Sequence, residues 1–152
     1  MKGVKTNALN EVRILASIDH PCIISYKQAF IDESSHSLCM VMEYADGGDL
    51  FDKISKHHQL RKYMKETEIW RIFIQVLEGL ACLHQLGIMH RDLKSANVFL
   101  FNDGRAKLGD LNVSKILKNN LSSTQTGTPY YASPEIWKDL PYGYKSDVWS
   151  LG

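Results

Sequence analysis

Hydrophobic positions along the chain repeat with two different periods, and each period predicts a different kind of element. The clearest helical repeat steps by four and three residues, through Ile69, Phe73, Val76, Leu80 and Leu83. Gly87 follows this stretch, and glycine is common just beyond a helix end because it tolerates a left-handed backbone. The pattern therefore predicts a long amphipathic helix that ends before Gly87.

Two further segments carry helical patterns. One repeats every third residue, through Leu9, Val12, Leu15 and Ile18. Pro21 follows it and cannot continue a helix. Residues 46–48, Asp-Gly-Gly, then interrupt the chain, and the apolar side chains at positions 50, 51 and 54 predict a short helix.

Short apolar runs bounded by polar turns predict strands. Residues 23–26 and 38–42 form one such pair, separated by a polar stretch. Residues 98–100 and 106–108 form another, on either side of Asn102-Asp103-Gly104, which is a strong hairpin signal. Because helices and short antiparallel strands are segregated along the chain, we predict an α+β fold.

The stretch 113–133 has neither period and is rich in Ser, Thr, Asn and Gly. Loops of this length are uncommon in compact domains unless they serve a function. We therefore expect a functional loop, within a single domain, since 152 residues suffice for one hydrophobic core.

Composition and charge argue against several classes of partner. The net charge of +1 provides no strong field for nucleic acid, and the longest apolar run is too short to cross a bilayer. The first seven residues lack the apolar core of a secretion signal, and three cysteines without a C-x-x-C motif argue against disulfides or a zinc ribbon. The six histidines show no metal-ligand spacing. We expect a cytoplasmic protein without nucleic-acid or membrane partners.

Residues 90–97 read His-Arg-Asp-Leu-Lys-Ser-Ala-Asn and carry candidate catalytic groups at fixed offsets. Phosphoryl transfer depends mainly on positioning and on neutralising charge. Asp92 can accept the proton of an acceptor hydroxyl, and Lys94 can offset charge on the transferred phosphate. Asn97 and Asp110 carry oxygens of the kind that Mg²⁺ prefers. A buried polar turn with a helix-capping Asp is the alternative interpretation of the string. It is the favoured one for Asp110 taken alone, but the offset of Asp110 from Asn97 favours the metal ligand.

Four further stretches accompany this loop in the order that one family shows. They are residues 10–15, 41–50, 127–135 and 144–152. With them, the chain resembles a eukaryotic serine/threonine protein kinase and, in detail, a NIMA-related kinase. The resemblance implies a truncated protein-kinase-like fold over residues 1–152, from helix αC to the αF helix. Its parts would be an N-lobe remnant (1–42), a hinge (43–49) and an incomplete C-lobe (50–152).

The resemblance also implies nucleotide-binding roles. Met42 would be the gatekeeper beside the adenine, and the Glu43 carbonyl and the Ala45 amide would hydrogen-bond the base. Asp49 would reach the ribose, and Phe99 would form the floor under the ring. The implied cofactors are ATP and Mg²⁺, and the implied substrate is a Ser or Thr of another protein.

Regulatory and substrate-binding roles follow from the same resemblance. Glu11 would pair with the nucleotide-binding lysine, and Thr128 would line the pocket for the acceptor residue. Thr124 would be the site of activating phosphorylation, and its phosphate would pair with Arg91. Competing acceptors are Ser122, Ser123 and Thr126. The resemblance extends the expected location from the cytoplasm to the cytoskeleton or the centrosome.

A hydrophobic spine is implied as well. Leu15, Tyr26, His90 and Leu111 would stack on one another, with Asp147 anchoring the His90 backbone. Ordinary core packing is the alternative for Leu15 and Tyr26.

The chain departs from the family at two places. Asp110-Leu111-Asn112 stands where the family has Asp-Phe-Gly. Asn replaces a glycine but is among the few other residues that adopt a left-handed backbone, so we expect altered switching of this loop and not a loss of chemistry. No glycine-rich loop precedes helix αC, and Lys2 and Lys5 lie too close to Glu11 to be the strand lysine. A non-catalytic, pseudokinase-like binding fragment is therefore the alternative to an ATP-dependent Ser/Thr kinase with Asp92 as base.

Overall fold

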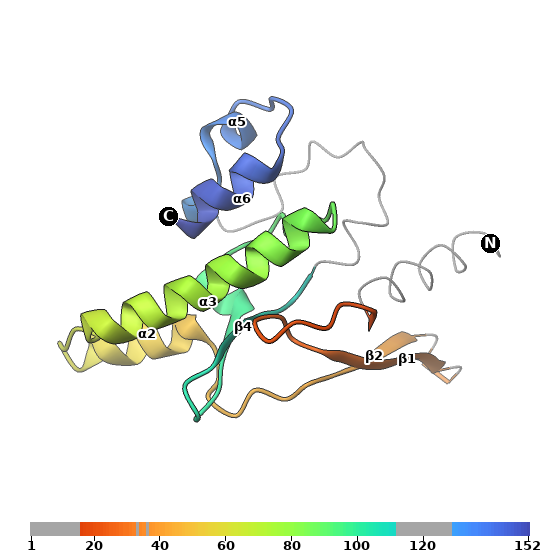
Figure 1. Ribbon diagram of the computed structural model, residues 1–152, viewed down its shortest axis with the longest axis horizontal. Helices are drawn as coiled ribbons and strands as arrows, with labels where there is room; N and C mark the ends of the chain where they lie inside the picture. The colour runs from red at the N-terminus through yellow and green to blue at the C-terminus, as the bar shows by residue number, and fades with distance from the viewer. Residues whose placement is uncertain (1–15, 33, 36, 112–128) are drawn as a thin grey trace.

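The computed structural model describes residues 16–32, 34–35, 37–111 and 129–152. Two antiparallel two-stranded sheets pack with helices (Figure 1). The sheets pair β1 (Tyr26–Asp32) with β2 (Ser37–Met42), and β3 (Val98–Leu100) with β4 (Ala106–Leu108). The helices within these ranges are α2 (Leu50–Gln59), α3 (Glu66–Gln85), α5 (Pro134–Trp137) and α6 (Tyr144–Leu151), with 3₁₀ turns at Ser95–Asn97 and Pro129–Tyr131. This arrangement confirms the predicted α+β fold.

Helix α3 is the long amphipathic helix that the hydrophobic period predicts. At its end the Gly87 N–H donates to the His84 carbonyl (3.0 Å) and the Ile88 N–H donates to the Leu83 carbonyl (2.9 Å), which is a Schellman motif. Gly87 has a φ of 76°, so its predicted place beyond the helix end is confirmed.

The buried face of α3 is displaced from the predicted stripe. Ile69 is 49% exposed, although it belongs to the predicted stripe. The buried positions are Ile72, Val76, Gly79, Leu80 and Leu83. Apolar residues occupy more than one face of this helix, and its packing between α6 and the β3–β4 hairpin decides which of them are buried (Figure 1).

The hydrophobic core lies where α3 meets the β3–β4 hairpin. Its buried members are Ile18, Ile23, Ile72, Val76, Leu80, Leu83, Leu93, Val98, Leu100, Ala106, Leu108 and Leu111. Burying one aliphatic side chain of this size stabilises a fold by roughly 1.5–3 kcal/mol. Because Leu93 and Leu111 are part of this core, it also fixes the two polar segments that contain them.

The predicted strand at residues 23–26 is wrong in its partner and extent. Pairing with β2 begins only at Tyr26, whereas Ile23 forms a parallel bridge to Leu108. The Ile24 N–H donates to the Leu108 carbonyl (2.7 Å), and the Leu108 N–H donates to the Cys22 carbonyl (2.8 Å). An apolar run predicts an extended buried segment, but it does not identify the strand that pairs with it. The 98–100 and 106–108 hairpin is confirmed as β3 and β4.

Gly79 marks a close approach of α3 to the backbone at residue 22. A Cβ added to Gly79 would lie 2.6 Å from the Cys22 carbonyl oxygen, closer than real Cβ atoms come to other atoms. We expect Gly79→Ala to lower the free energy of unfolding by about 1–3 kcal/mol, although alanine favours helix by roughly 1 kcal/mol. Urea unfolding measures this change. Thr67→Ala, at an exposed site on the same helix, is the control and should change it by under about 0.5 kcal/mol. A Gly79→Ala protein as stable as the parent would contradict the close approach.

Two predicted elements lie largely outside the described residues, namely the helix over residues 9–18 and the loop over residues 113–133. They stay predictions. In the described part of the chain, no helix combines the length and the apolar character that crossing a membrane requires.

Candidate active site

The loop at residues 90–97 is anchored by a buried carboxylate from a distant helix. Asp147 lies in the first turn of α6 and is 3% exposed. Its Oδ2 accepts a hydrogen bond from the His90 backbone N–H (2.9 Å), and its Oδ1 accepts one from the Arg91 N–H (2.8 Å). The Nε2 atom of His84, at the end of α3, lies 2.9 Å from the same Oδ2. The predicted anchoring of the His90 backbone by Asp147 is confirmed.

The His90 ring fills the space behind this loop. It is 1% exposed, and its Nε2 lies 3.2 Å from the Gly109 carbonyl oxygen. Burial lowers the pKa of His90, and the charge of Asp147 opposes this only in part. A neutral imidazole therefore packs against the segment that leads from β4 into Asp110. Gly109 itself is confined, because a Cβ there would lie 2.5 Å from the Phe99 ring.

Two polar side chains of the loop converge on the Asp92 carboxylate. The Asp92 Oδ2 lies 3.1 Å from the Lys94 Nζ, and the two side chains are only 12% and 24% exposed. The Asn97 Nδ2 donates to the Asp92 carbonyl (2.7 Å) and to its Oδ2 (3.3 Å). The structure thus brings together the base, the cation and the amide that the sequence pattern singled out. In a partly dry site such charge-assisted contacts fix the carboxylate in one orientation.

The backbone is strained at two positions of this site. Arg91 has a φ of 64° and Asp110 a φ of 50°, in the left-handed region that non-glycine residues seldom adopt. The only other described non-glycine residues with positive φ are Arg61 and Asp139. Residues held in such conformations cost roughly 1–3 kcal/mol and persist where the surrounding contacts determine them, often at functional sites. For Arg91, the hydrogen bond to Asp147 is one such contact.

The oxygens of Asn97 and Asp110 suit a magnesium ion. Among the described residues, the Asn97 side chain makes two hydrogen bonds and both use its Nδ2, so its Oδ1 has no partner there and could serve as a ligand. The Gly109 N–H donates to the Asn97 carbonyl (3.0 Å), so Asp110 begins next to Asn97, and its carboxylate is exposed. Mg²⁺ often takes only one or two protein ligands and completes its shell with phosphate oxygens and water. The described ranges contain no cluster of three His, Cys, Asp or Glu side chains placed to hold a metal.

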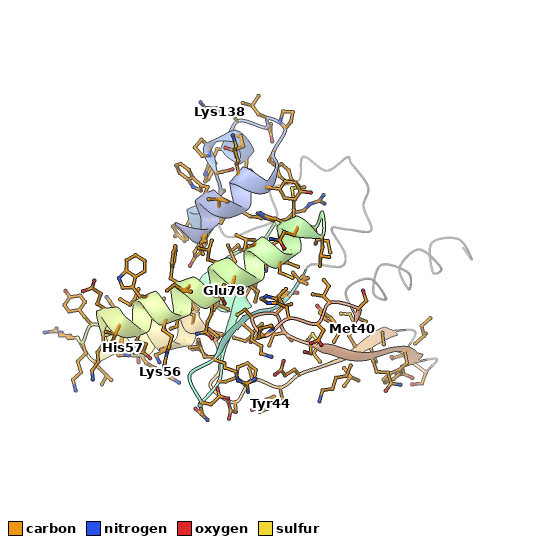
Figure 2. All side chains as sticks on the ribbon, viewed as in Figure 1. Met40, Tyr44, Lys56, His57, Glu78 and Lys138 are labelled. Atoms are coloured by element: carbon orange, nitrogen blue, oxygen red, sulfur yellow. The ribbon has the colours of Figure 1, made fainter. Side chains whose placement is uncertain are left out.

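The segment after β2 presents unpaired backbone groups. Within the described residues, the carbonyl oxygen of Glu43 and the N–H of Ala45 have no hydrogen-bond partner. Between them lies Tyr44, which is labelled in Figure 2 and is 85% exposed. Further along, the Gly47 N–H donates to the Leu100 carbonyl (2.9 Å), which joins the segment to β3. The segment therefore presents one acceptor, the Glu43 carbonyl, and one donor, the Ala45 N–H, two residues apart. The bond from Gly47 to Leu100 holds the segment just after them.

The Glu43 side chain is held by a cation from β4. Its carboxylate lies 2.7 Å and 2.9 Å from the Nζ of Lys107, a β4 residue that is 5% exposed. Burial alone would raise the pKa of Glu43, but hydrogen bonds from Lys107 and Ser25 and the charges of Lys107 and Arg105 hold that pKa below its usual value.

Comparison with known proteins decides the family. The model of the protein kinase domain matches residues 1–152, the full length of the sequence. The chain belongs to the protein kinase domain family. It is 42% identical to serine/threonine-protein kinase Nek3 of Mus musculus over 154 residues, 42% identical to Nek6 of Oryza sativa subsp. japonica over 145, and 43% identical to Nek11 of Homo sapiens over 143.

These matches cover 100%, 95% and 93% of this chain but only 29%, 27% and 22% of the relatives. The chain therefore spans less than a third of the length of these proteins. The resemblance to the NIMA-related kinases is confirmed, since all three relatives carry Nek names.

Several predicted site residues of this kinase domain lie outside the described residues. They are Glu11, Leu15, Asn112, Thr124 and Thr128. Their roles stay predictions, and so does the division into residues 1–42, 43–49 and 50–152.

The described nucleotide-site candidates are placed as follows. Met42 ends β2 and is 42% exposed, next to Glu43. Asp49 uses its Oδ1 to cap α2 through the Asp52 N–H (2.8 Å), so a contact to ribose would fall to its other oxygen. Phe99 is half-buried, with its ring against Gly109.

Tyr26 lies close to the spine residues that the structure describes. Burial raises the pKa of the Tyr26 hydroxyl and the charge of Asp110 adds to this, while a hydrogen bond to the Leu111 backbone opposes it. Leu111 is 2% exposed and belongs to the core, and Tyr26 packs against that core. Tyr26 and Leu111 therefore meet as the spine prediction requires, although core packing alone would bring them together too.

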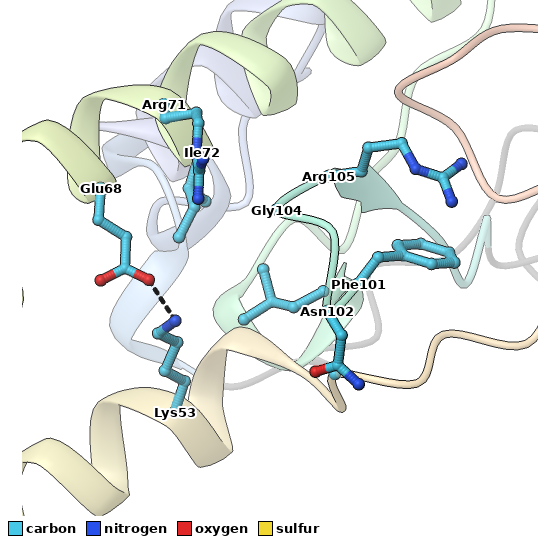
Figure 3. Close-up of a pocket in the computed structure, with 10 residues that line it drawn as sticks. Lys53, Glu68, Arg71, Ile72, Phe101, Asn102, Gly104 and Arg105 are labelled. Carbon is cyan, nitrogen blue, oxygen red and sulfur yellow. Dashed lines mark hydrogen bonds and ion pairs between the residues drawn. The ribbon is translucent and has the colours of Figure 1, made fainter.

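A separate polar cavity of about 180 Å³ lies among α2, α3 and the β3–β4 turn (Figure 3). Lys53 and Glu68 form an ion pair across it, and Arg105 pairs with Asp103 at 2.7 Å beside it. None of residues 90–97 lines the cavity. The cavity is therefore not part of the site built around Asp92.

Three contributors to this site were not identified from the sequence. His84 contacts Asp147, and Lys107 contacts Glu43, as described above. The Tyr131 hydroxyl lies 2.9 Å from the Ser95 Oγ, which ties the loop to the segment before α5. A signal existed for Lys107, since a cation stands inside an otherwise apolar strand; nothing in the sequence marked the other two.

Proposed function

We propose that this chain is catalytic in a serine/threonine protein kinase, which transfers the γ-phosphate of ATP to a Ser or Thr hydroxyl of another protein. One observation carries the proposal. The Asp92 carboxylate is held 3.1 Å from the Lys94 ammonium, on a loop whose backbone is fixed by a buried aspartate. Positioning and charge neutralisation are what phosphoryl transfer demands of a protein.

The proposed reaction gives each side chain a defined task. Asp92 orients the acceptor hydroxyl and accepts its proton as the acceptor oxygen bonds to the γ-phosphorus. The bond from that phosphorus to the bridging oxygen breaks, and ADP leaves. Lys94 offsets negative charge on the transferred group. Asn97 and Asp110 would hold Mg²⁺, which, when bound, neutralises charge on the phosphate oxygens.

The same proposal places adenine at the segment after β2. The free carbonyl of Glu43 would accept a hydrogen bond from the exocyclic amino group, and the free N–H of Ala45 would donate to a ring nitrogen. Unpaired backbone groups near a ligand site cost little when solvent or a ligand satisfies them. Met42, Asp49 and Phe99 keep the roles that the family resemblance implies.

For regulation and location, the proposal rests on the family resemblance alone. Glu11 would pair with a nucleotide-binding lysine, and Thr128 would contact the acceptor residue. Phosphorylation of Thr124 would create a partner for Arg91. We propose a cytoplasmic location with cytoskeletal or centrosomal association.

Nucleotide binding provides the first test. We expect saturating ATP with Mg²⁺ to raise the melting temperature, because a ligand at 100 times its Kd stabilises by about 2.7 kcal/mol. Asp110→Asn should weaken ATP binding by about tenfold with Mg²⁺ and hardly at all with EDTA, since it removes the negative charge of a metal ligand and no contact to adenine. Calorimetric titration measures both.

The control is Asp103→Asn, which changes an exposed aspartate of the β3–β4 turn. It should leave the Mg²⁺ dependence unchanged. If saturating ATP and Mg²⁺ produced no shift in the parent chain, the kinase proposal would fail, and a non-catalytic binding role would replace it.

A further inference from the structure

We propose that Lys107 is a positioning residue for nucleotide binding, which acts by fixing Glu43 and with it the backbone that meets adenine. The inference rests on the proposed function, because it concerns the adenine-facing groups of that site. Lys107 itself does not reach the nucleotide in this scheme. Its ammonium binds the side-chain carboxylate of Glu43, the residue whose backbone carbonyl would accept a hydrogen bond from adenine.

The contact between Lys107 and Glu43 has the features of a fixed ion pair. The Lys107 Nζ lies 2.9 Å from Oε1 and 2.7 Å from Oε2 of Glu43, and the two side chains are 6% and 19% exposed. Phe101, itself a core residue, places its ring centroid 5.4 Å from the same ammonium. Solvent therefore screens the pair little, and breaking the ion pair would leave an unpaired charge in a place that water barely reaches.

Glu43 transmits this constraint to its own backbone. Its N–H donates to the Ser25 carbonyl (2.8 Å), and the Ser25 N–H donates back to the Glu43 Oε2 (3.3 Å). The backbone N–H and the carboxylate are thus both engaged, whereas the carbonyl has no hydrogen-bond partner among the described residues. Because the N–H and the carboxylate of Glu43 are both held, we expect the direction of its backbone carbonyl to be restricted as well.

The position of Lys107 along β4 explains why this residue can hold Glu43. It pairs with Phe99 in the hairpin register, and its neighbour Leu108 pairs with Ile23. The strand is therefore bound on both edges and buried at all its positions. A rigid strand of this kind restricts the position of the ammonium. The ion pair therefore fixes the position of Glu43 relative to the hairpin that carries Phe99.

Removing the cation should loosen the adenine-facing groups more than the rest of the protein. We expect Lys107→Met to raise the KM for ATP about tenfold with kcat within about twofold, because contacts to adenine act equally on ground and transition states. In the unliganded protein, hydrogen exchange at the Glu43 amide should accelerate about tenfold more than exchange at Leu80 in α3. Arg105→Met is the matched control. The Arg105 side chain lies 3.8 Å from the same carboxylate but is 49% exposed, so the KM for ATP and the exchange rate at the Glu43 amide should each change less than twofold.

A second variant keeps the test decisive if Lys107→Met is too unstable to assay. Lys107→Met combined with Glu43→Gln removes both charges, so no unpaired charge stays buried and folding should recover. The proposal requires ATP affinity to stay weak in this double variant while its melting temperature returns towards the parent value. Recovery of affinity together with stability would show a merely structural ion pair and overturn the proposal. Equal acceleration of exchange at Glu43 and Leu80 would overturn it as well.

Failure of the proposed function is distinguishable from failure of this inference. A parent chain that binds no ATP with Mg²⁺ would refute the kinase proposal and the nucleotide role of Lys107 with it. Exchange at the Glu43 amide would still decide whether Lys107 fixes this segment, since that measurement needs no nucleotide.

Discussion

Asp92→Asn should reduce phosphoryl transfer by about 100- to 10,000-fold, because a positioned general base contributes on that scale. Asparagine has nearly the shape of aspartate but accepts no proton and offers Lys94 no charge. ATP binding should be retained, since no adenine or metal contact of the proposed site uses Asp92. Transfer of labelled phosphate to a generic protein substrate, set beside calorimetric ATP affinity, separates the two effects.

Lys94→Met provides the companion measurement, because it removes the cation that lies 3.1 Å from the Asp92 Oδ2 but leaves the base in place. We expect a smaller loss of turnover from it than from Asp92→Asn. Asp139→Asn, at an exposed aspartate outside the site, should leave turnover within about twofold of the parent. Undiminished transfer by Asp92→Asn would exclude Asp92 as the base.

Asp147→Ala should cause a large loss of stability. The substitution leaves the His90 and Arg91 amides and the His84 ring without their shared acceptor in a buried place. Leaving such groups unsatisfied costs roughly 3–5 kcal/mol in total. At about 2–4 °C per kcal/mol for a domain of this size, the melting temperature should fall by about 6–20 °C. Calorimetry measures the fall directly.

Asp147→Asn should lie between the parent and Asp147→Ala, because asparagine keeps one accepting oxygen. Asp139→Asn again serves as the control, since both residues tolerate the left-handed backbone at position 139. A melting temperature for Asp147→Ala within 2 °C of the parent would mean that the loop does not depend on this anchor.

The local parts of this fold could be predicted because local rules determine them. The period of α3, the glycine beyond its end and the Asn-Asp-Gly turn between β3 and β4 each depend on residues within a few positions of one another. The partner of residues 23–26 depended on β4, more than eighty residues away in sequence, and an apolar run does not specify such a partner. Ile69 was assigned to the buried face for a similar reason, because a helix with more than one apolar face is oriented only by its neighbours.

The candidate site divides in the same way. The sequence singles out three candidates, Asp92, Lys94 and Asn97, because residues with the required side-chain groups stand at fixed offsets in one short loop. The Lys107 contact to Glu43 spans 64 residues and the His84 contact to Asp147 spans 63. Neither pair has a spacing rule, since the two partners meet only after separate elements have packed.

The anchoring of the loop by Asp147 has a consequence for the biogenesis of the protein. The His90 amide is made 57 residues before the carboxylate that receives it. At translation rates of about 5–20 residues per second, the nascent loop waits roughly 3 to 11 seconds for its acceptor. During that interval Arg91 lacks the bond to Asp147 that helps to hold its left-handed conformation, so the loop should be open to proteases and chaperones. A pause in synthesis just before the codon for Asp147 would lengthen this vulnerable period without altering a single residue.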